Sequence, residues 1–266
     1  MDLIAVHYEN FESVSKTAVN ADLLFDYSDV FEDDQGSLPG VAHFVVDETV
    51  STVTSSACRA PHAIKSKVKA ELEKLIEREI IAHVKELTSW CNHMVVATKK
   101  PWKLQICIDP RSLSKAFQRE HYPLSVMEGM LPKLSGARVF SKLDLSNAYW
   151  YVHPDEEWNF LTTFQTPYGR YRWKRIPFGT SVSSELFQKR LDQALEGLSG
   201  VLGVSDDIVV YGEGDDDEPV SKDHDRNLTA LLKKCQDVVM KLSKERAELW
   251  KTEISFLGYL VMSDGG

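Results

Sequence analysis

The chain has 266 residues, 43% of them hydrophobic and 27% charged, which is enough to build a buried core. It has no apolar run of the roughly 18 to 20 residues that span a membrane, its first residues lack a signal-peptide pattern, and its four cysteines form no CxxC pair. These features exclude a membrane protein, a secreted disulfide scaffold and a zinc module, and they predict an intracellular protein of the cytoplasm or nucleus.

The formal net charge of −9 conceals an uneven distribution along the chain. Residues 1–56 hold eleven acidic residues and one basic residue, whereas residues 59–142 hold sixteen basic and eight acidic residues. Nucleic-acid binding responds to the local field and not to the total charge, so the basic block keeps nucleic acid among the candidate partners. The alternative for this block is an ordinary solvated helix face.

The first half of the chain predicts an extension followed by a basic helix and a hairpin. Residues 1–56 are expected to form an acidic N-terminal extension and linker, with a short helix at 19–31. Apolar residues recur every three to four positions over 63–84 with lysines between them, which indicates an amphipathic helix with a basic outer face. Two apolar strands at 94–98 and 104–108 follow, joined by a basic tip.

The second half mixes strands and helices without strict alternation, which predicts the α+β fold class. The expected elements, in chain order, are a strand at 139–145, a short helix at 146–151, a hairpin of strands 161–164 and 169–173, a helix at 184–198, a hairpin of strands 201–204 and 208–211, a long helix at 223–242 and a strand pair at 254–261.

Adjacent carboxylates mark the tip of the hairpin at 201–211. Asp206 and Asp207 stand between two apolar strands. Two like charges this close are unfavourable without a cation. A single aspartate at a turn is explained by local capping of backbone donors, but two in succession favour a metal site.

A third carboxylate, Asp144, lies near the end of another apolar strand. A buried aspartate needs a partner, and the sequence offers no basic residue at a same-face position beside it. If this strand lies next to the acidic hairpin, three carboxylates meet at one sheet edge, where such oxygen ligands select Mg²⁺ or Mn²⁺ and two ions assist displacement at phosphorus. The alternative is that Asp144 caps the helix that follows.

At this point the chain resembles the reverse transcriptases of gypsy-type LTR retrotransposons. Each matching string is weak alone, but the ordered set is highly specific and extends over roughly residues 20–264. The strings are 143–150, 166–173, 176–179, 187–188, 204–207 and 256–259.

The resemblance implies a right-hand polymerase with an antiparallel palm sheet flanked by helices. It implies basic fingers at 57–142 and a palm at 143–266 that carries the catalytic and primer-grip hairpins. Because the chain stops soon after the second hairpin, we expect the thumb to be absent or truncated. RNase H and integrase portions of a longer polyprotein are expected outside this chain.

The resemblance also implies roles for individual residues. Asp144, Asp206 and Asp207 match the catalytic carboxylates that hold two Mg²⁺ or Mn²⁺ ions. Tyr149 matches the aromatic residue that stacks under the incoming sugar and disfavours a 2′-hydroxyl, although a core tyrosine is the simpler alternative. The other nucleotide-binding positions are Phe178, Gly179, Lys99, Lys100 and Lys103. The template and primer positions are Arg111, Phe256, Leu257, Gly258 and Tyr259; for the last four, a plain apolar hairpin is the alternative.

The chain departs from the family at several positions. Gln105 stands where relatives usually have an arginine on the triphosphate, and a neutral amide cannot replace the charge of a guanidinium. Tyr151 replaces a usual glutamine. Residues 180–184 lack the usual alanine and proline, which predicts a looser start for the following helix.

Two functions from different classes follow. The first is RNA-directed DNA polymerase activity, in which deoxynucleoside triphosphates extend a primer on an RNA or DNA template by a two-metal mechanism. The second is a catalytically weak or inactive remnant that binds nucleic acid. The departures at Gln105 and 180–184, Trp102 in place of a usual glycine and the expected lack of a thumb motivate it. A nucleotide cyclase needs the same carboxylates but not the fingers and primer-grip strings, so it ranks last.

Overall fold

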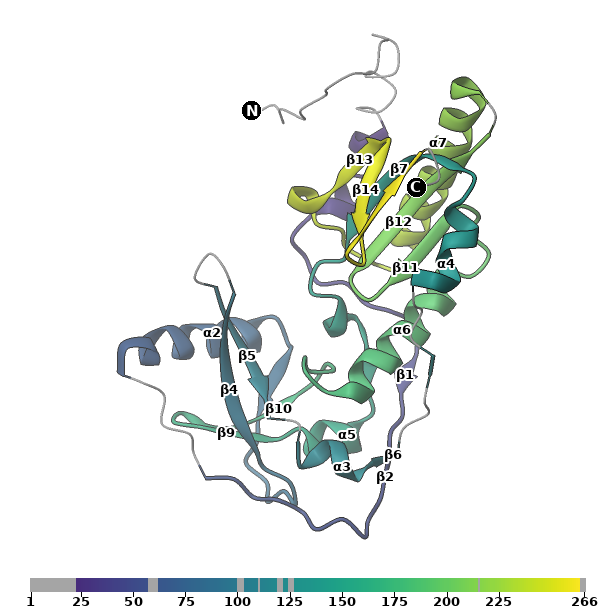
Figure 1. Ribbon diagram of the computed structural model, residues 1–266. Coiled ribbons are helices and arrows are strands. Elements are labelled where there is room, and N and C mark those ends of the chain that lie inside the picture. The colour runs from purple at the N-terminus through teal and green to yellow at the C-terminus, as the bar shows by residue number, and fades with distance from the viewer. Residues whose placement is uncertain are drawn as a thin grey trace.

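The computed structural model describes residues 23–56, 62–99, 103–109, 111–118, 122–123, 127–214 and 216–263. These residues form two parts, each built around its own sheet (Figure 1). A five-stranded sheet lies in the lower part of the view and a four-stranded sheet in the upper part. Within the described ranges, every helix is too short or too polar to cross a membrane.

The five-stranded sheet has the order β3-β10-β9-β4-β5. Its strands are β3 (Ile81–His83), β4 (Asn92–Lys99), β5 (Lys103–Ile108), β9 (Phe164–Thr166) and β10 (Gly169–Trp173). The sheet takes strands from both sides of residue 142, where the sequence predicts a boundary between fingers and palm. That boundary stays a prediction.

Helix α2 (Lys65–Glu77) covers this sheet and follows the short helix η2 (His62–Ile64). Val68, Leu72 and Leu75 form its buried face, as the apolar spacing predicts. The helix ends earlier than expected because Glu79 adopts a left-handed φ of 54°. Ile80 continues the helical spacing in the sequence but leads into β3 instead, and it is fully buried there.

The four-stranded sheet has the order β11-β12-β7-β13, with all pairs antiparallel. Its strands are β11 (Val201–Val204), β12 (Asp207–Glu213), β7 (Ala137–Asp144) and β13 (Glu248–Lys251). Both faces are buried. Ile208 and Val210 contribute to the main core on one face, whereas Val209 and Tyr211 contribute to a second core on the other.

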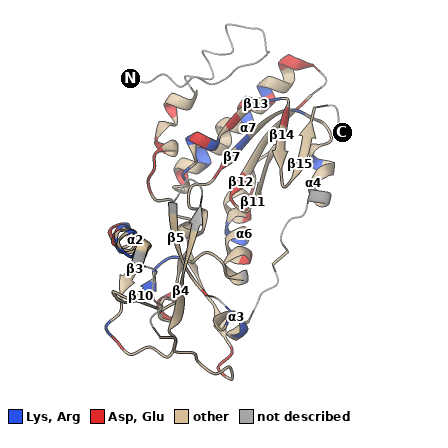
Figure 2. Ribbon diagram, turned by 60° about the vertical axis from the view of Figure 1, so that its left-hand side comes forward, with Lys and Arg blue, Asp and Glu red and all other residues tan. Residues whose placement is uncertain are grey.

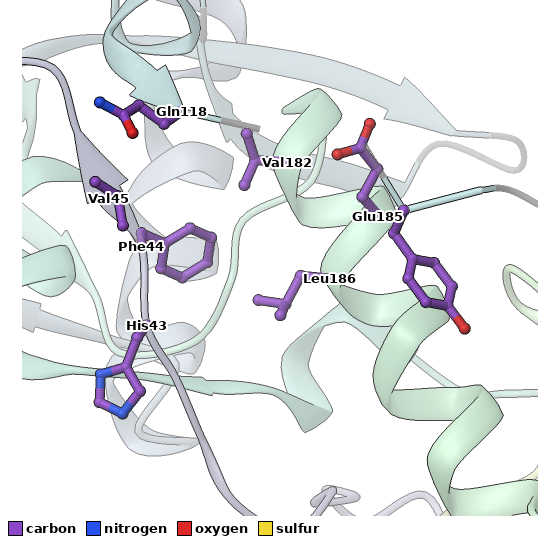
Figure 3. Close-up of a pocket in the computed structure, with 8 residues that line it drawn as sticks. His43, Phe44, Val45, Gln118, Val182, Glu185 and Leu186 are labelled. Atoms are coloured by element: carbon purple, nitrogen blue, oxygen red, sulfur yellow. The ribbon is translucent and has the colours of Figure 1, made fainter. Parts of the chain in front are cut away.

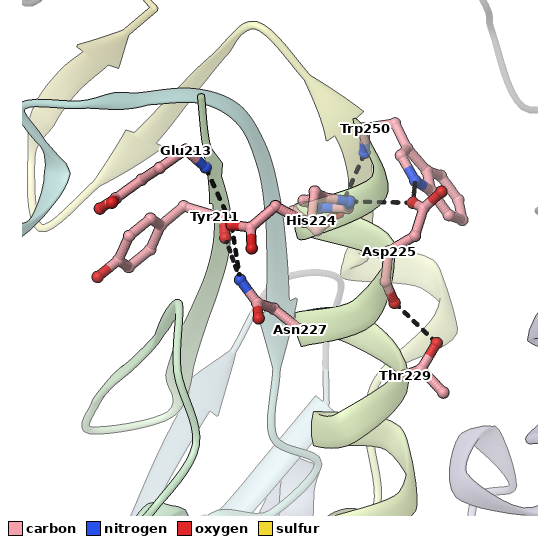
Figure 4. Close-up of polar contacts among 9 residues, drawn as sticks. Tyr211, Glu213, His224, Asp225, Asn227, Thr229 and Trp250 are labelled. Carbon is pink, nitrogen blue, oxygen red and sulfur yellow. Dashed lines mark hydrogen bonds and ion pairs between the residues drawn. The ribbon is translucent and has the colours of Figure 1, made fainter. Parts of the chain in front are cut away.

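Helices α6 (Ser181–Leu195) and α7 (Asp217–Asp237) pack on the main-core face, and α7 is fastened by a polar network (Figure 4). Asn227 Nδ2 donates to the Tyr211 carbonyl at 3.0 Å, and Trp250 Nε1 donates to Asp225 Oδ1 at 2.8 Å. His224 Nε2 lies 2.9 Å from Ser141 Oγ of β7. These bonds fix α7 against β12, β7 and β13 together.

The second core lies between the same sheet and three short elements. These are α4 (Met127–Leu134) and the hairpin of β14 (Glu253–Phe256) and β15 (Tyr259–Met262). Phe140 of β7 packs there with the buried side chains of Ile254 and Phe256.

The N-terminal residues pack more closely than an extension would. Val30, Leu38 and Ala42 belong to the main core. The short helix η1 (Ser28–Phe31) precedes two edge pairings, of β1 (Val41–Ala42) with β8 (His153–Pro154) and of β2 (Val45–Val46) with β6 (Phe117–Gln118). The described residues of 1–56 are therefore an integral part of the fold.

The remaining helices are short. They are α3 (Leu113–Ala116), η3 (Ala148–Tyr151), α5 (Glu156–Leu161) and η4 (Lys244–Arg246). The strand expected at 161–164 is wrong except at its last residue, because α5 extends to Leu161 and β9 begins only at Phe164. Asp155 Oδ1 caps α5 by accepting a hydrogen bond from the Trp158 amide at 2.8 Å.

Candidate active site

The pairing of β7 with β12 brings Asp144 beside the acidic hairpin. Asp207 lies directly opposite Asp144 in the antiparallel register, and Ile208 lies opposite Leu143. The Leu145 amide donates to the Asp206 carbonyl at 2.7 Å, which extends the contact into the turn. The backbones of the three carboxylates therefore meet at one end of the sheet.

Gln188 of α6 supports the turn that carries Asp206. Ser205 adopts a left-handed φ of 51° in this turn, a conformation that is strained for a residue with a Cβ. The buried Gln188 side chain accepts from the Ser205 amide and donates to the Gly203 carbonyl, both at 2.9 Å. The helix thus fixes the geometry of the hairpin tip.

Asp144 is buried, with 8% of its surface exposed. Burial raises the pKa of this carboxyl to about 6, and the charges of Asp206 and Asp207 contribute to the rise. Nearby Arg246 and Lys142 oppose it. Burial, the largest cause, therefore disfavours the ionised form of Asp144 even with Arg246 beside it.

Two basic side chains approach the carboxylates. Arg246 Nη2 lies 2.6 Å from Asp144 Oδ1, and Lys142 Nζ lies 3.6 Å from Asp207 Oδ2. The expectation that no basic residue lies beside Asp144 on the same face of its strand is wrong, because Lys142, two residues earlier on β7, lines the same cleft. Arg246 is the closer cation. The partner comes from η4, far along the chain.

A cleft of about 270 Å³ lies over these side chains. It is lined by Lys142, Asp144, Asp207, Glu245, Arg246, Ala247 and Glu248. Among the described residues, no three His, Cys, Asp or Glu side chains converge as a ready-made set of metal ligands. Asp144 Oδ1, however, is buried and accepts no hydrogen bond of good geometry there, so its contact with Arg246 is an ion pair alone. A buried carboxylate oxygen of this kind suits a hard divalent cation.

Tyr149 lies in an aromatic cluster close to the carboxylates. Its half-buried ring lies 5.0 Å from that of Phe178 and 5.3 Å from that of Phe187, measured between ring centroids. Its hydroxyl lies 3.0 Å from Ser184 Oγ, and burial raises the pKa of Tyr149. Gly179, next to Phe178, has a φ of +96°, which favours glycine.

The start of α6 differs from the loosened helix that the sequence predicts. Thr180 Oγ1 accepts a hydrogen bond from the Ser183 amide at 3.0 Å, which caps the helix at its first turn. A side-chain cap therefore stands in place of the missing proline.

The basic positions of the fingers hairpin lie on β4, β5 and the loop after them. Lys99 and Lys103 are paired at the end of the two strands where the chain connects them, Lys100 lies outside the described residues, and Gln105 is paired with Ala97. Arg111 is 85% exposed and forms an ion pair with Asp109, with Nη2 and Oδ2 2.5 Å apart.

The last hairpin joins a buried strand to an exposed turn. Phe256 is fully buried, Leu257 and Gly258 form the turn with φ angles of 51° and 83°, and Tyr259 is 54% exposed. Lys142 Nζ donates to the Ser255 carbonyl at 3.0 Å, which ties this hairpin to β7 beside the carboxylates.

A second, smaller cavity of about 50 Å³ lies between the N-terminal segment and α6 (Figure 3). Its lining is mostly apolar and includes Phe44, Val182 and Leu186. It contains none of the residues singled out from the sequence.

Sequence reasoning missed the roles of Arg246 and Ser184 and assigned none to Gln188. Gln188 lies in one of the sequence strings that resemble the family, at 187–188, but the sequence does not reveal which groups its side chain contacts. Arg246 gives no local signal, because only the tertiary fold brings η4 to Asp144.

Comparison with known proteins gives a consistent result. Residues 80–261 match the family described as reverse transcriptase (RNA-dependent DNA polymerase). The chain is 28% identical over 218 residues to the retrovirus-related Pol polyprotein from transposon 412 of Drosophila melanogaster, which covers 78% of this chain and 17% of that protein. It is 31% identical over 163 residues to the enzymatic polyprotein of cauliflower mosaic virus (strain Strasbourg), which covers 61% of this chain and 23% of that protein. The chain thus spans about a fifth of the length of these relatives.

The fold matches solved structures as well. The foamy viral protease-reverse transcriptase in complex with RNA/DNA hybrid superposes with a TM-score of 0.82 at 20% identity, over 95% of this chain and 33% of that one. The foamy viral protease-reverse transcriptase dRH in complex with double-stranded DNA also superposes with a TM-score of 0.82 at 20% identity, over 95% of this chain and 44% of that one.

Proposed function

The chain belongs to the reverse transcriptase (RNA-dependent DNA polymerase) family, and on this premise we propose that it extends a primer with deoxynucleotides on an RNA or DNA template. The proposal assigns it to the gypsy-type branch of retroelement enzymes. It takes residues 57–142 as fingers and 143–266 as the palm, so that β9 and β10 of the palm segment complete the five-stranded sheet of the fingers.

One observation supports the proposal most strongly. Asp144 and Asp207 are direct partners on neighbouring strands, and Asp206 occupies the turn between β11 and β12. Three carboxylates at one sheet end repel one another, and Arg246 and Lys142 offset only part of that repulsion, because the pKa of Asp144 stays raised. A site for divalent cations explains why the fold keeps three mutually repelling carboxylates together.

Asp144, Asp206 and Asp207 are the residues that would hold two Mg²⁺ or Mn²⁺ ions. Such ions lower the pKa of the primer 3′-hydroxyl and offset the charge that builds up on the triphosphate. The chain itself contributes the rigid backbone beneath them. Gln188 fixes the hairpin tip, and the Ser243 amide holds the Asp144 carbonyl at 2.8 Å.

The remaining site residues are proposed to bind the nucleotide and the primer–template. Tyr149 and Phe178 present aromatic surface beside the carboxylates, and Gly179 allows the chain to turn there. Lys99, Lys100 and Lys103 would attract the triphosphate. Arg111 would contact the template, and Phe256, Leu257, Gly258 and Tyr259 would position the primer end.

Primer extension by the purified chain tests this proposal. We expect Mg²⁺- or Mn²⁺-dependent addition of the deoxynucleotide that is complementary to the template, on RNA and on DNA. An Asp206→Asn variant removes one carboxylate charge and is expected to extend at least a hundredfold more slowly. Absence of extension by the unmodified chain, or equal extension by the variant, would refute the proposal.

A nucleic-acid-binding remnant is the second candidate. Two observations favour it. The ion pair with Arg246 occupies the Asp144 carboxylate that would bind a cation, and the neutral Gln105 lacks the positive charge that would bind the triphosphate. It predicts salt-sensitive binding to nucleic acid without turnover. Binding measured alongside primer extension separates the two candidates.

A further inference from the structure

The segment that carries Arg246 is fastened beside Asp144. The Ser243 amide donates to the Asp144 carbonyl at 2.8 Å. Two residues earlier, the Tyr151 hydroxyl donates to the Lys241 carbonyl at 2.7 Å and accepts from the Lys241 amide at 3.1 Å. These bonds hold the start of η4 at the end of β7, so Arg246 is within reach of the Asp144 side chain.

The contact joins an exposed cation to a buried anion. The Arg246 side chain is 60% exposed, whereas that of Asp144 is 11% exposed. Arg246 also donates through Nε to Ser243 Oγ at 3.4 Å, a long hydrogen bond within its own turn. An ion pair with one partner in water is screened and stabilises little, so the arginine can be displaced at low cost.

Arg246 and a divalent cation need the same oxygen. Mg²⁺ binds oxygen ligands at about 2.0–2.1 Å, a distance at which a guanidinium 2.6 Å from the same atom faces strong like-charge repulsion. The cleft holds Lys142 on the other side, 3.6 Å from Asp207. Binding of a cation to Asp144 therefore requires Arg246 to move away.

We infer that Arg246 is an internal counter-ion that neutralises Asp144 in the cation-free protein and competes with divalent cations for it. The inference rests on the proposed function only in taking Asp144 as a cation ligand. It predicts that the resting site binds cations weakly, because each binding event first breaks the ion pair.

Binding of Mn²⁺ to the full chain without nucleic acid tests the inference, with free Mn²⁺ measured by electron paramagnetic resonance. An Arg246→Gln variant is expected to bind Mn²⁺ roughly three- to fivefold more tightly than the unmodified chain, the upper range that loss of a screened ion pair allows. Adding Asp144→Asn to this variant is expected to abolish the gain. An Arg246→Lys variant keeps the charge and is expected to stay within about twofold of the unmodified chain.

Arg138→Gln is the matched control. Arg138 lies at the other end of β7, where it pairs with Asp217 at 3.5 Å, and its loss changes the net charge of the chain by the same amount. Equal tightening by both variants would reduce the effect to general electrostatics and overturn the inference, as would unchanged or undetectable binding in Arg246→Gln. Primer extension is scored separately, so failure of the polymerase proposal leaves this result interpretable.

Discussion

Asp144 is needed as an ionised carboxylate for the proposed cation binding, but its burial in the folded protein disfavours that ionised form. Its carboxyl has a pKa of about 6 in the folded protein against an ordinary value of 3.8, mainly because of burial. The folded state therefore holds this proton more tightly than the unfolded chain. Protonation of Asp144 therefore favours the folded state. This contribution to the free energy of unfolding is fully present below about pH 4 and is lost as the pH rises through about 6.

This difference predicts that Asp144→Asn stabilises the cation-free protein at high pH. One pKa unit corresponds to about 1.4 kcal/mol, so after an allowance for the lost ion pair with Arg246 we expect a gain of about 1 to 2 kcal/mol at pH 8. At pH 4 the gain should disappear, because the carboxyl is then protonated in the folded protein. Urea unfolding at both pH values, with a chelator present, measures it; a loss of stability at pH 8 would contradict the account.

The hydroxyl pair of Tyr149 and Ser184 gives a second prediction at this scale. Because the two oxygens lie 3.0 Å apart, Tyr149→Phe and Ser184→Ala each break the same bond. Each is expected to cost about 1 kcal/mol of unfolding free energy, and the double variant about as much as either single one. A double-mutant cycle checks this, with Ser135→Ala, whose Oγ bonds Pro132 in another region, as control. Additive losses would show that the pair is not coupled.

At the scale of elements, the carboxylate hairpin and its neighbouring strand were predictable from local pattern. Strands β7, β11 and β12 are short apolar runs bounded by polar turns, and they form near the expected positions. Strand β13 was not predictable, because Trp250 has a φ of 50° and the register with β7 shifts there. Helix α5 was missed because its six residues are defined by the Asp155 cap more than by apolar spacing.

The contacts of Asp144 were out of reach for a different reason. Its proximity to Asp207 could be predicted on the condition that their strands pair, because Asp144 is the last residue of one apolar strand and Asp207 the first of another. Its pairing with Arg246 depends on the path of the chain after α7, which no periodicity encodes. The three acidic residues of the site could therefore be predicted from the sequence, but not the pairing of Asp144 with Arg246.

The docking of α7 on β12 is expected to depend on Gly212. A Cβ at this position would lie 2.5 Å from the Val220 carbonyl oxygen and 2.8 Å from the His224 amide nitrogen, both backbone atoms of α7. Gly212→Ala should therefore cost about 2 kcal/mol of unfolding free energy, as overpacking does. Gly129→Ala in α4 is the control, because nothing lies within 4 Å of its added Cβ. Equal denaturation midpoints for the two variants would contradict this packing.

At the scale of the whole molecule, charge is separated along the chain. Figure 2 shows basic residues on α2, α3 and α6, with acidic residues among them on α2 and α6, and residues of both signs along α7. Because residues 59–142 hold sixteen basic and eight acidic residues, a chain with a net charge of −9 can still present a locally basic surface to the proposed nucleic-acid partner. The negative net charge of the whole chain is therefore a poor guide to whether it binds nucleic acid.

Salt dependence of nucleic-acid binding tests this separation. Under the second candidate function, in which the basic block at 59–142 contacts nucleic acid, changing Lys99, Lys100 and Lys103 together to glutamine is expected to weaken binding. It should lower the slope of log K against log salt concentration by about 2 to 3, because each lost phosphate contact removes about 0.9. Changing Lys222, Lys233 and Lys234 of α7 removes the same charge from outside that block and should leave the slope nearly unchanged. Equal effects of the two triple variants would contradict a local basic surface.

The account depends on a cation site shared by Asp144 and the acidic hairpin, and iron-directed cleavage measures that site without requiring turnover. Fe²⁺ takes similar ligands to Mg²⁺ and Mn²⁺. With peroxide and ascorbate it generates radicals that cut the backbone nearby. The account predicts cuts near residues 144 and 205–207 that excess Mg²⁺ suppresses and Asp144→Asn abolishes. Cuts elsewhere, or cuts unchanged in the variant, would contradict it.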